Sequence, residues 1–250
     1  MTTYQSNTKL QVKALNAYYQ ELPILKDLSF HLNQGEFVSI IGPSGCGKST
    51  IFNLISGILK PTSGTIYIDG EVHTGETGRV SYMYQKDLLL PWRKIIDNVG
   101  LPLVLDGRKK KDARNQVQPY FSLFGLEGFE HKYPHQLSGG MRQRAALMRT
   151  YMYKSDIILL DEPFGGLDAI TKSKLQDWLL SILPQLKASM LFITHDIEEA
   201  IYLSDRIYVL SERPAYVKKE FVIDVPRPRD RDITTSDHFN EIKREILHLL

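Results

Sequence analysis

One glycine-rich segment has the residue types and the spacing of a phosphate-binding loop. It matches G-x-x-x-x-G-K-[ST] and is followed by Thr50. Its glycines let backbone N–H groups turn inward around phosphate oxygens, Lys48 adds a positive charge, and the Ser49 hydroxyl is suited to ligate Mg²⁺. We therefore predict that this phosphate loop binds a nucleoside triphosphate, with Cys46 a bystander rather than a nucleophile. The loop reads Gly42-Pro43-Ser44-Gly45-Cys46-Gly47-Lys48-Ser49.

Two acidic residues end a buried apolar run later in the chain. Asp161 and Glu162 directly follow residues 157–160. Consecutive strand residues point to opposite sides, so the two carboxylates face different ways. We expect Asp161 to hold Mg²⁺ and Glu162 to orient and deprotonate an attacking water. Alone, two acids would more simply cap the next element, but beside a phosphate loop the catalytic interpretation is favoured.

A histidine ends a second apolar run. His195 follows residues 191–194 and precedes Asp196. From a strand end it could donate a hydrogen bond to a γ-phosphate. A lone histidine is usually structural, so this role depends on the family resemblance described below. The other histidines have no comparable setting, and no Cys/His cluster indicates zinc.

Short apolar strands and helical patterns alternate around these residues, except in the middle of the chain. Residues 37–41 run directly into the phosphate loop and then into a helix over 47–58, the order that such a loop requires. Three helical patterns follow one another in the middle, over 95–105, 110–124 and 139–153. The other predicted strands cover residues 10–15, 28–32, 65–68, 80–84, 157–160, 190–193 and 207–210.

This order predicts an α/β fold with a helical insert. The core would comprise residues 1–86 and 155–225, and the helical subdomain residues 87–154. Residues 226–232 form a linker rich in Pro, Arg and Asp. The last residues of the chain place an apolar stripe on one face of a short helix, which we expect to pack back on the core. That stripe consists of Phe239, Ile242, Ile246 and Leu249.

Composition narrows the classes of function. The net charge of +2 gives no global basic field of the kind that nucleic-acid binding uses. A single cysteine among 250 residues excludes an internal disulfide and fits a reducing compartment. The polar N-terminus lacks the apolar stretch of a signal peptide, and no apolar run approaches the roughly 20 residues of a membrane span. We expect a cytoplasmic protein that reaches a membrane only through a partner.

A further segment carries a family resemblance. Residues 137–144, here called the signature segment, read Leu137-Ser138-Gly139-Gly140-Met141-Arg142-Gln143-Arg144 and resemble the signature sequence of ABC ATPases. Six motifs occur in that family's order and spacing over nearly the whole chain. The other five are the phosphate loop, Gln85, Asp161-Glu162, Gly165-Gly166-Leu167-Asp168 and His195. The resemblance implies a P-loop NTPase with a RecA-like α/β core, an antiparallel β subdomain and an inserted α-helical subdomain. Residues 1–225 would then form the ATPase domain, and residues 226–250 a linker and C-terminal helix.

The resemblance also implies roles at the site. In this family two subunits sandwich two ATP molecules head to tail, with Mg²⁺. Ser138, Gly139 and Gly140 would cap the γ-phosphate held by the other subunit's phosphate loop, which predicts a homodimer. Further implied roles are catalysis and Mg²⁺ sensing for Gln85, coupling of the two active sites for Asp168, and adenine stacking for Tyr19, with Tyr18 as the alternative.

The finer resemblance is to ATPases of bacterial importers for taurine, sulfonates, nitrate and thiamine-precursor pyrimidines. It is carried by residues 42–50, Leu90-Pro91-Trp92, the signature segment and residues 194–196. It implies an ATP-hydrolysing subunit on the inner face of the cell membrane, with integral-membrane permease subunits and a separate solute-binding protein. An apolar group, Leu88, Leu89, Leu90 and Trp92, is expected either to receive a short permease helix or to anchor the helical insert.

The alternative is a soluble ABC-type ATPase acting on nucleic acid or another macromolecule. Such proteins usually carry a coiled-coil insertion or two ATPase domains, and neither fits in 250 residues. We therefore expect no nucleic-acid partner. A P-loop kinase is a third hypothesis, which the signature segment and Glu162 disfavour.

Overall fold

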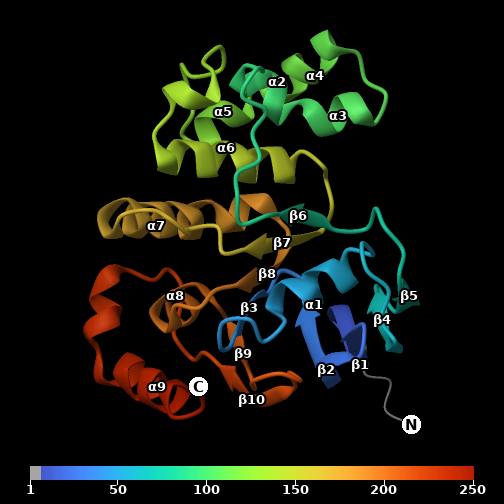
Figure 1. The fold of residues 1–250 in the computed structure, drawn as a ribbon. Coiled ribbons are helices and arrows are strands. Elements are labelled where there is room, and N and C mark those ends of the chain that lie inside the picture. Colours follow the sequence, from blue (N-terminus) through green and yellow to red (C-terminus); the bar gives the residue numbers. More distant parts are fainter. Residues whose placement is uncertain (1–6) are drawn as a thin grey trace.

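The computed structural model describes residues 7–250 as two β-sheets flanked by helices, with a separate block of helices at one end (Figure 1). Residues 1–6, which we assigned to the polar start of the core, lie outside the described residues. The α/β fold with an inserted helical block is confirmed. The proposed subdomain boundaries near residues 86, 154 and 225 stay predictions.

The larger sheet places the carboxyl ends of its parallel strands side by side. It has six strands in the order β10-β9-β3-β8-β7-β6, all parallel except the edge strand β10. Every residue of β3, β7 and β8 is buried, because helices or the second sheet cover both faces. Its strands are β3 (Phe37–Ile41), β6 (Ser81–Met83), β7 (Ile157–Asp161), β8 (Ser189–Ile193), β9 (Arg206–Leu210) and β10 (Val217–Val222).

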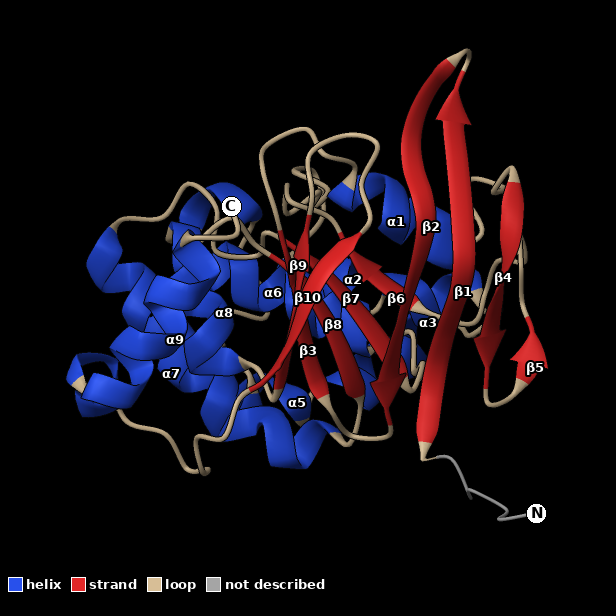
Figure 2. Ribbon diagram, turned by 90° about the horizontal axis from the view of Figure 1, so that it is seen from below, coloured by secondary structure: helices blue, strands red, loops and turns tan. Residues whose placement is uncertain are grey.

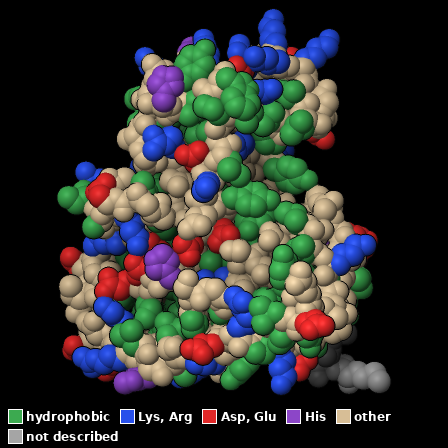
Figure 3. All heavy atoms as spheres, in the orientation of Figure 1, with side chains coloured by type: hydrophobic (Ala, Val, Ile, Leu, Met, Phe, Trp, Pro, Cys, Tyr) green, Lys and Arg blue, Asp and Glu red, His purple; other side chains and the backbone are tan. Residues whose placement is uncertain are grey.

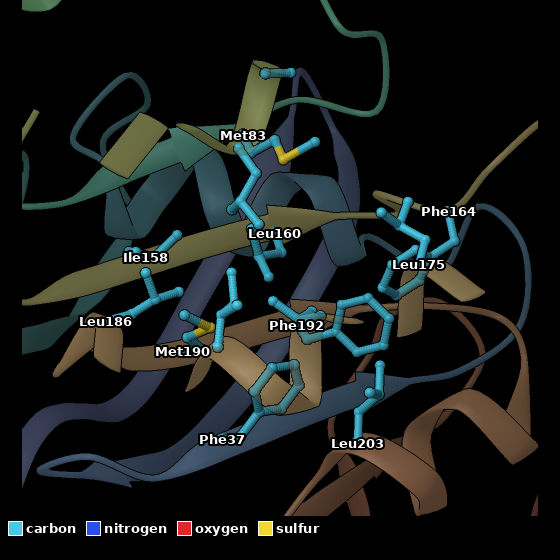
Figure 4. Close-up of a cluster of buried hydrophobic side chains, with 14 of the residues drawn as sticks. Phe37, Met83, Ile158, Leu160, Phe164, Leu175, Leu186, Met190, Phe192 and Leu203 are labelled. Atoms are coloured by element: carbon cyan, nitrogen blue, oxygen red, sulfur yellow. The ribbon is translucent and has the colours of Figure 1, made fainter. Parts of the chain in front are cut away.

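Alternate residues of these strands enter two different cores. In β8, Met190 and Phe192 face one side, while Leu191 and Ile193 face the other. The first side packs against α6 (Gly139–Tyr151), α7 (Ala169–Leu186) and α8 (Ile197–Leu203), and Figure 4 shows part of this cluster around Leu160 and Phe192. The second side packs against α1 (Lys48–Ile55) and the smaller sheet. The phosphate loop therefore starts from a strand held firmly on both faces.

The smaller sheet is antiparallel and carries a long hairpin. Its strand order is β2-β1-β4-β5, with β1 at Thr8–Tyr19, β2 at Leu22–Asn33, β4 at Ser63–Ile68 and β5 at Glu71–Val72. The predicted strands over 10–15 and 28–32 were too short. Four register shifts interrupt the pairing of β1 with β2 and break the alternating apolar pattern from which strand length is predicted. Figure 2 shows this hairpin rising well beyond the other strands.

The inserted block is more broken than predicted. Its helices are α2 (Ile95–Val99), α3 (Leu101–Leu105), α4 (Lys110–Val117), α5 (Tyr120–Leu123) and α6 (Gly139–Tyr151). The single helix predicted over 95–105 breaks at Gly100, and the one over 110–124 breaks before α5 at Pro119, which has no N–H to continue the helix. The end of α6 packs into the block, where the Tyr151 ring meets those of Tyr120 and Phe124.

The C-terminal helix packs on the core, as predicted. In α9 (Asp237–Leu247), Phe239 and Ile246 are buried and the helix lies against α8. The preceding residues are not a free linker: the buried Arg229 guanidinium donates to the backbone oxygens of Ile201, Tyr202 and Ser204. Burial lowers the pKa of Arg229 to about 10. The edge strand β10 was not predicted. Between residues 7 and 250, no helix has both the length and the apolar character that a membrane crossing needs.

Candidate functional site

The phosphate loop connects β3 to α1 and is held mostly by its own backbone. Lys48 is only 7% exposed, and its ammonium donates to the backbone oxygens of Gly42 and Pro43 at 2.8 and 2.9 Å. Gly47 precedes α1 with φ 119°, and a Cβ there would lie 2.8 Å from Ile24 Cγ2. Only glycine fits this turn. No side chain caps α1, which leaves the first N–H groups of the helix available to an anion.

Asp161 ends β7 close to this loop. It is 7% exposed, and the Tyr82 hydroxyl donates to its Oδ2 at 3.1 Å. Burial raises the pKa of the Asp161 carboxyl, opposed by hydrogen bonds from Ser49 and Tyr82. A buried carboxylate beside the Ser49 hydroxyl is a pair of hard oxygen ligands, and the cost of its burial falls when a cation binds. The residues present therefore fit Mg²⁺.

The three residues predicted to be catalytic lie together, although they follow three different strands. Gln85 Nε2 donates to Glu162 Oε2 at 3.0 Å, and His195 Nδ1 lies 3.3 Å from Glu162 Oε1. Their strands β6, β7 and β8 are neighbours in the sheet. Glu162 has φ 44°, a left-handed conformation that is rare for this residue type. One carboxylate is thus held between an amide and an imidazole.

The signature segment starts α6 as a capped helix. The Ser138 hydroxyl accepts the Met141 N–H at 3.3 Å. A Cβ on Gly139 would lie 2.9 Å from Leu167 Cδ2, so the glycine allows this helix start to approach residues 165–168 closely. Ser138 itself is exposed.

Asp168 stands at the start of α7, next to the signature segment. Its Oδ1 accepts the Thr171 N–H at 3.0 Å, and this bond lowers the pKa of its carboxyl. An open hollow of about 490 Å³ separates the Gln85 segment from the signature helix. Its lining includes Gln85, Leu88, Gly139, Arg142, Gly165 and Leu167.

The predicted adenine platform lies at the tip of the β1–β2 hairpin. Tyr19 is 71% exposed and Tyr18 55% exposed, so both rings are accessible for stacking. This exposure does not distinguish Tyr19 from Tyr18 as the residue that stacks on adenine. Across residues 7–250, no hydrogen bond or ion pair joins the phosphate loop to residues 138–140. The two predicted anion sites are therefore separate within one chain.

Comparison with known proteins decides the family. The family model described as ABC transporter matches residues 25–165. The chain is 42% identical to the aliphatic sulfonates import ATP-binding protein SsuB of Bacillus cereus over 224 residues, which span 90% of this chain and 87% of that protein. The chain belongs to the ABC transporter ATP-binding family. This confirms the resemblance seen in the motifs and the P-loop NTPase fold.

Other members of the ABC transporter family agree. The chain is 41% identical to the formylaminopyrimidine import ATP-binding protein ThiZ of Halalkalibacterium halodurans, over 94% of this chain and 92% of that one. A dimeric ATP-binding cassette in a post-hydrolysis state with ADP and Pi superposes with a TM-score of 0.73 at 29% identity, covering 87% of this chain and all of that one. This ABC protein is an ATPase, and none of these relatives is described as acting on nucleic acid.

Two residues at the site of this ABC ATPase were not predicted from the sequence. Tyr82 donates to Asp161 and lies within the predicted strand 80–84. The sequence signal that could have identified it is a tyrosine in the strand next to the one that ends in the two acidic residues. Arg213 contacts the phosphate loop from the segment between β9 and β10. No local pattern marks it, because its partner is 168 residues away in the sequence.

Proposed function

We propose that this chain is the ATP-hydrolysing subunit of a bacterial ABC importer and takes up a small solute through separate permease subunits. The observation that carries the catalytic part is the Gln85–Glu162–His195 arrangement next to Asp161 and the phosphate loop. The direction of transport is supported by relatives that are themselves named import ATP-binding proteins.

The proposed chemistry assigns one task to each side chain. Residues 42–50 bind the phosphates of ATP, and Tyr19 stacks on adenine. Ser49, Asp161 and Gln85 would hold Mg²⁺, which when bound neutralises phosphate charge. Glu162 takes a proton from a water molecule while the oxygen of that water attacks the γ-phosphorus. The bond between the γ-phosphorus and the leaving ADP oxygen breaks. His195 is positioned to donate a hydrogen bond to the transferred phosphoryl group.

The proposed assembly is a homodimer in which each site is completed by the partner. Ser138, Gly139 and Gly140 form a helix start that no hydrogen bond within residues 7–250 joins to the phosphate loop. We assign them to the γ-phosphate bound by a second copy, and Asp168 to the link between the two sites. One solved relative is a dimer, which supports this arrangement.

A groove between the helical block and the core is the proposed permease site. It encloses about 800 Å³. Figure 3 shows hydrophobic side chains gathered in the notch between the upper helices and the rest of the molecule. Leu88 lines the groove and is 50% exposed, and Trp92, four residues later in the chain, is 70% exposed, whereas Leu89 is buried. Leu89 thus anchors the insert, while Leu88 and Trp92 are available to a partner. The other lining residues include Tyr82, Tyr84, Leu101, Leu105, Arg149 and Tyr153.

We propose that a short cytoplasmic helix of the permease occupies this groove, so that the chain sits on the inner face of the membrane. Apolar anchors in such a groove suit a helix with an apolar face. A separate solute-binding protein on the far side completes the proposed importer.

The test pairs assembly with basal activity. Trp92→Ala is expected to keep the thermal stability and the ATPase activity of the isolated subunit, to weaken capture of the permease about tenfold or more, and to abolish uptake. Val72→Ala, an exposed residue on β5, is the control and should change nothing. Normal capture and transport by Trp92→Ala would move the docking surface elsewhere. ATPase activity stimulated by nucleic acid, with no permease captured, would favour the soluble alternative.

A further inference from the structure

The segment between β9 and β10 reaches the phosphate loop and contributes a guanidinium to it. Arg213 Nε donates to the backbone oxygen of Gly45 at 3.1 Å, and its Nη2 donates to the same oxygen. Arg213 matches no motif and has no part in the chemistry assigned above. Because a bond from a charged donor is about twice as strong as a neutral one, this contact bears on how the loop is held.

The contact fixes the direction of one peptide unit. The C=O and N–H of a trans peptide point in opposite directions, so an outward Gly45 carbonyl sends the Cys46 N–H inward. That N–H indeed points into the loop, where it donates to the Pro43 oxygen at 3.3 Å. Gly45 has φ 75°, in the left-handed region that favours glycine. A reversed peptide would present an oxygen, not an N–H, to a bound phosphate.

The base of Arg213 is itself anchored. The backbones of Ser211 and Tyr216 are hydrogen-bonded at 3.0 Å. Ala215 donates to the Ile24 oxygen at 2.8 Å and accepts from the Lys26 N–H at 3.0 Å. The segment is thus tied to β2, whose hairpin carries Tyr19. The guanidinium is held against the loop from a fixed support, on the side opposite to the inward Cys46 N–H.

We infer that Arg213 is a positioning residue for nucleotide phosphates: it holds the Gly45–Cys46 peptide with its N–H facing the bound anion and adds a second positive charge after Lys48. This inference rests on the proposed role of residues 42–50 as the phosphate site. It assigns to Arg213 a share of the affinity for phosphate-bearing nucleotides and none of the affinity for the base.

The experiment is equilibrium binding of adenosine, ADP and ATP to the full chain. Arg213→Ala is expected to weaken ADP and ATP about tenfold and adenosine less than about twofold, while Arg213→Lys recovers part of the loss. The ATP KM should rise more than kcat falls. Glu212→Ala, an exposed neighbour on the same segment, is the matched control and should bind all three normally.

Two results would overturn the inference. One is unchanged ADP and ATP binding in Arg213→Ala. The other is an equal loss for adenosine and ATP together with a lowered melting temperature without nucleotide, which would make Arg213 a structural residue. Lys48→Ala separates this inference from its premise. If Lys48→Ala also binds ATP normally, the phosphate-loop assignment itself fails, whereas if only Lys48→Ala loses binding, the inference on Arg213 alone fails.

Discussion

The phosphate loop and the signature segment are both glycine-containing starts of helices, but the fold supports them differently. In the phosphate loop, Lys48 is buried and bonded to two backbone oxygens, and Gly47 fits against Ile24. In the signature segment, Ser138 is exposed, its hydroxyl accepts the Met141 N–H and its backbone oxygen accepts the Arg142 N–H, both from its own helix. One helix start is braced by the core, and the other is presented to the surroundings.

This difference indicates that the two helix starts have different roles in nucleotide binding. A braced loop can bind a nucleotide within one subunit because its geometry exists before the ligand arrives. An exposed, self-capped helix start adds affinity only when a phosphate is brought to it from outside. The Glu162 carboxylate belongs with the first region, since Gln85 and His195 hold it at the sheet edge. Substitutions in the phosphate loop and in the signature segment should therefore impair the protein in different ways.

The largest expected effect is at Glu162. Glu162→Gln removes the proton acceptor but keeps the shape of the side chain, so turnover should fall about 10²-fold or more while ATP binding is retained. An ATP-bound dimer should accumulate, because closure no longer ends in hydrolysis. Lys48→Ala should instead lose ATP binding itself. Steady-state turnover, nucleotide titration and gel filtration measure these quantities, and near-wild-type turnover in Glu162→Gln would remove this residue from its role.

The next effect tests whether the exposed start acts on another subunit. Ser138→Arg places bulk and charge at the capping position, so its ATPase activity should be lost while its own phosphate loop still binds ATP. Mixed with Lys48→Ala, it can form a heterodimer with one intact composite site, and part of the activity should return. Full activity of Ser138→Arg as a dilute monomer would contradict shared sites.

The sequence predicts the braced region better than the exposed one. Buried parallel strands are continuous apolar runs, so residues 37–41 were predicted with the bounds that β3 has. The phosphate loop and the pair Asp161-Glu162 follow such strands directly. That Gln85 and His195 meet at Glu162 could not be derived from spacing, since it depends on the order of strands in the sheet.

Other features left no local signal. Strand β10 contains Lys218, Lys219 and Glu220 in succession, because an edge strand keeps these side chains in solvent and needs no apolar alternation. The helical block was predicted as longer helices because Gly100 and Pro119 interrupt patterns that remain apolar on both sides. The contact of Arg213 with Gly45 joins segments 168 residues apart.

A smaller effect is expected at the adenine platform, which neither helix start includes. Tyr19→Ala should raise the ATP KM about tenfold with little change in kcat, because stacking on an aromatic ring contributes about 1–3 kcal/mol. Stacking is tolerant of base identity, so GTP should substitute fairly well for ATP in the wild type. A larger effect from Tyr18→Ala would move the platform by one residue, and unchanged KM values in both variants would place it elsewhere.

The smallest effect concerns the block that supports the signature helix. Asp97 lies in α2, which packs against α6, and its carboxylate accepts two hydrogen bonds from Arg114, both 2.8 Å long. These bonds lower the pKa of Asp97. A lowered folded-state pKa gives stability that is present above the unfolded value of about 3.9 and is lost as the pH falls through the folded value. The phosphate loop has no part in this ion pair.

Asp97→Asn should therefore destabilise the protein by about 1–2 kcal/mol at pH 7, a value reduced by the partial exposure of Arg114. The gap from the wild type should begin to close as the pH falls below about 4, where the carboxyl becomes protonated in the unfolded chain, and should close further as the pH falls through the lowered folded-state pKa. Urea unfolding at several pH values measures it, with Glu127→Gln, an exposed residue of the same block, as the control. Nucleotide binding should be unchanged, because the braced loop stands on the core, whereas dimer-dependent turnover should fall as the signature helix loosens. A gap that stays constant down to pH 2 would show that the Asp97 carboxylate is not the source of this stability.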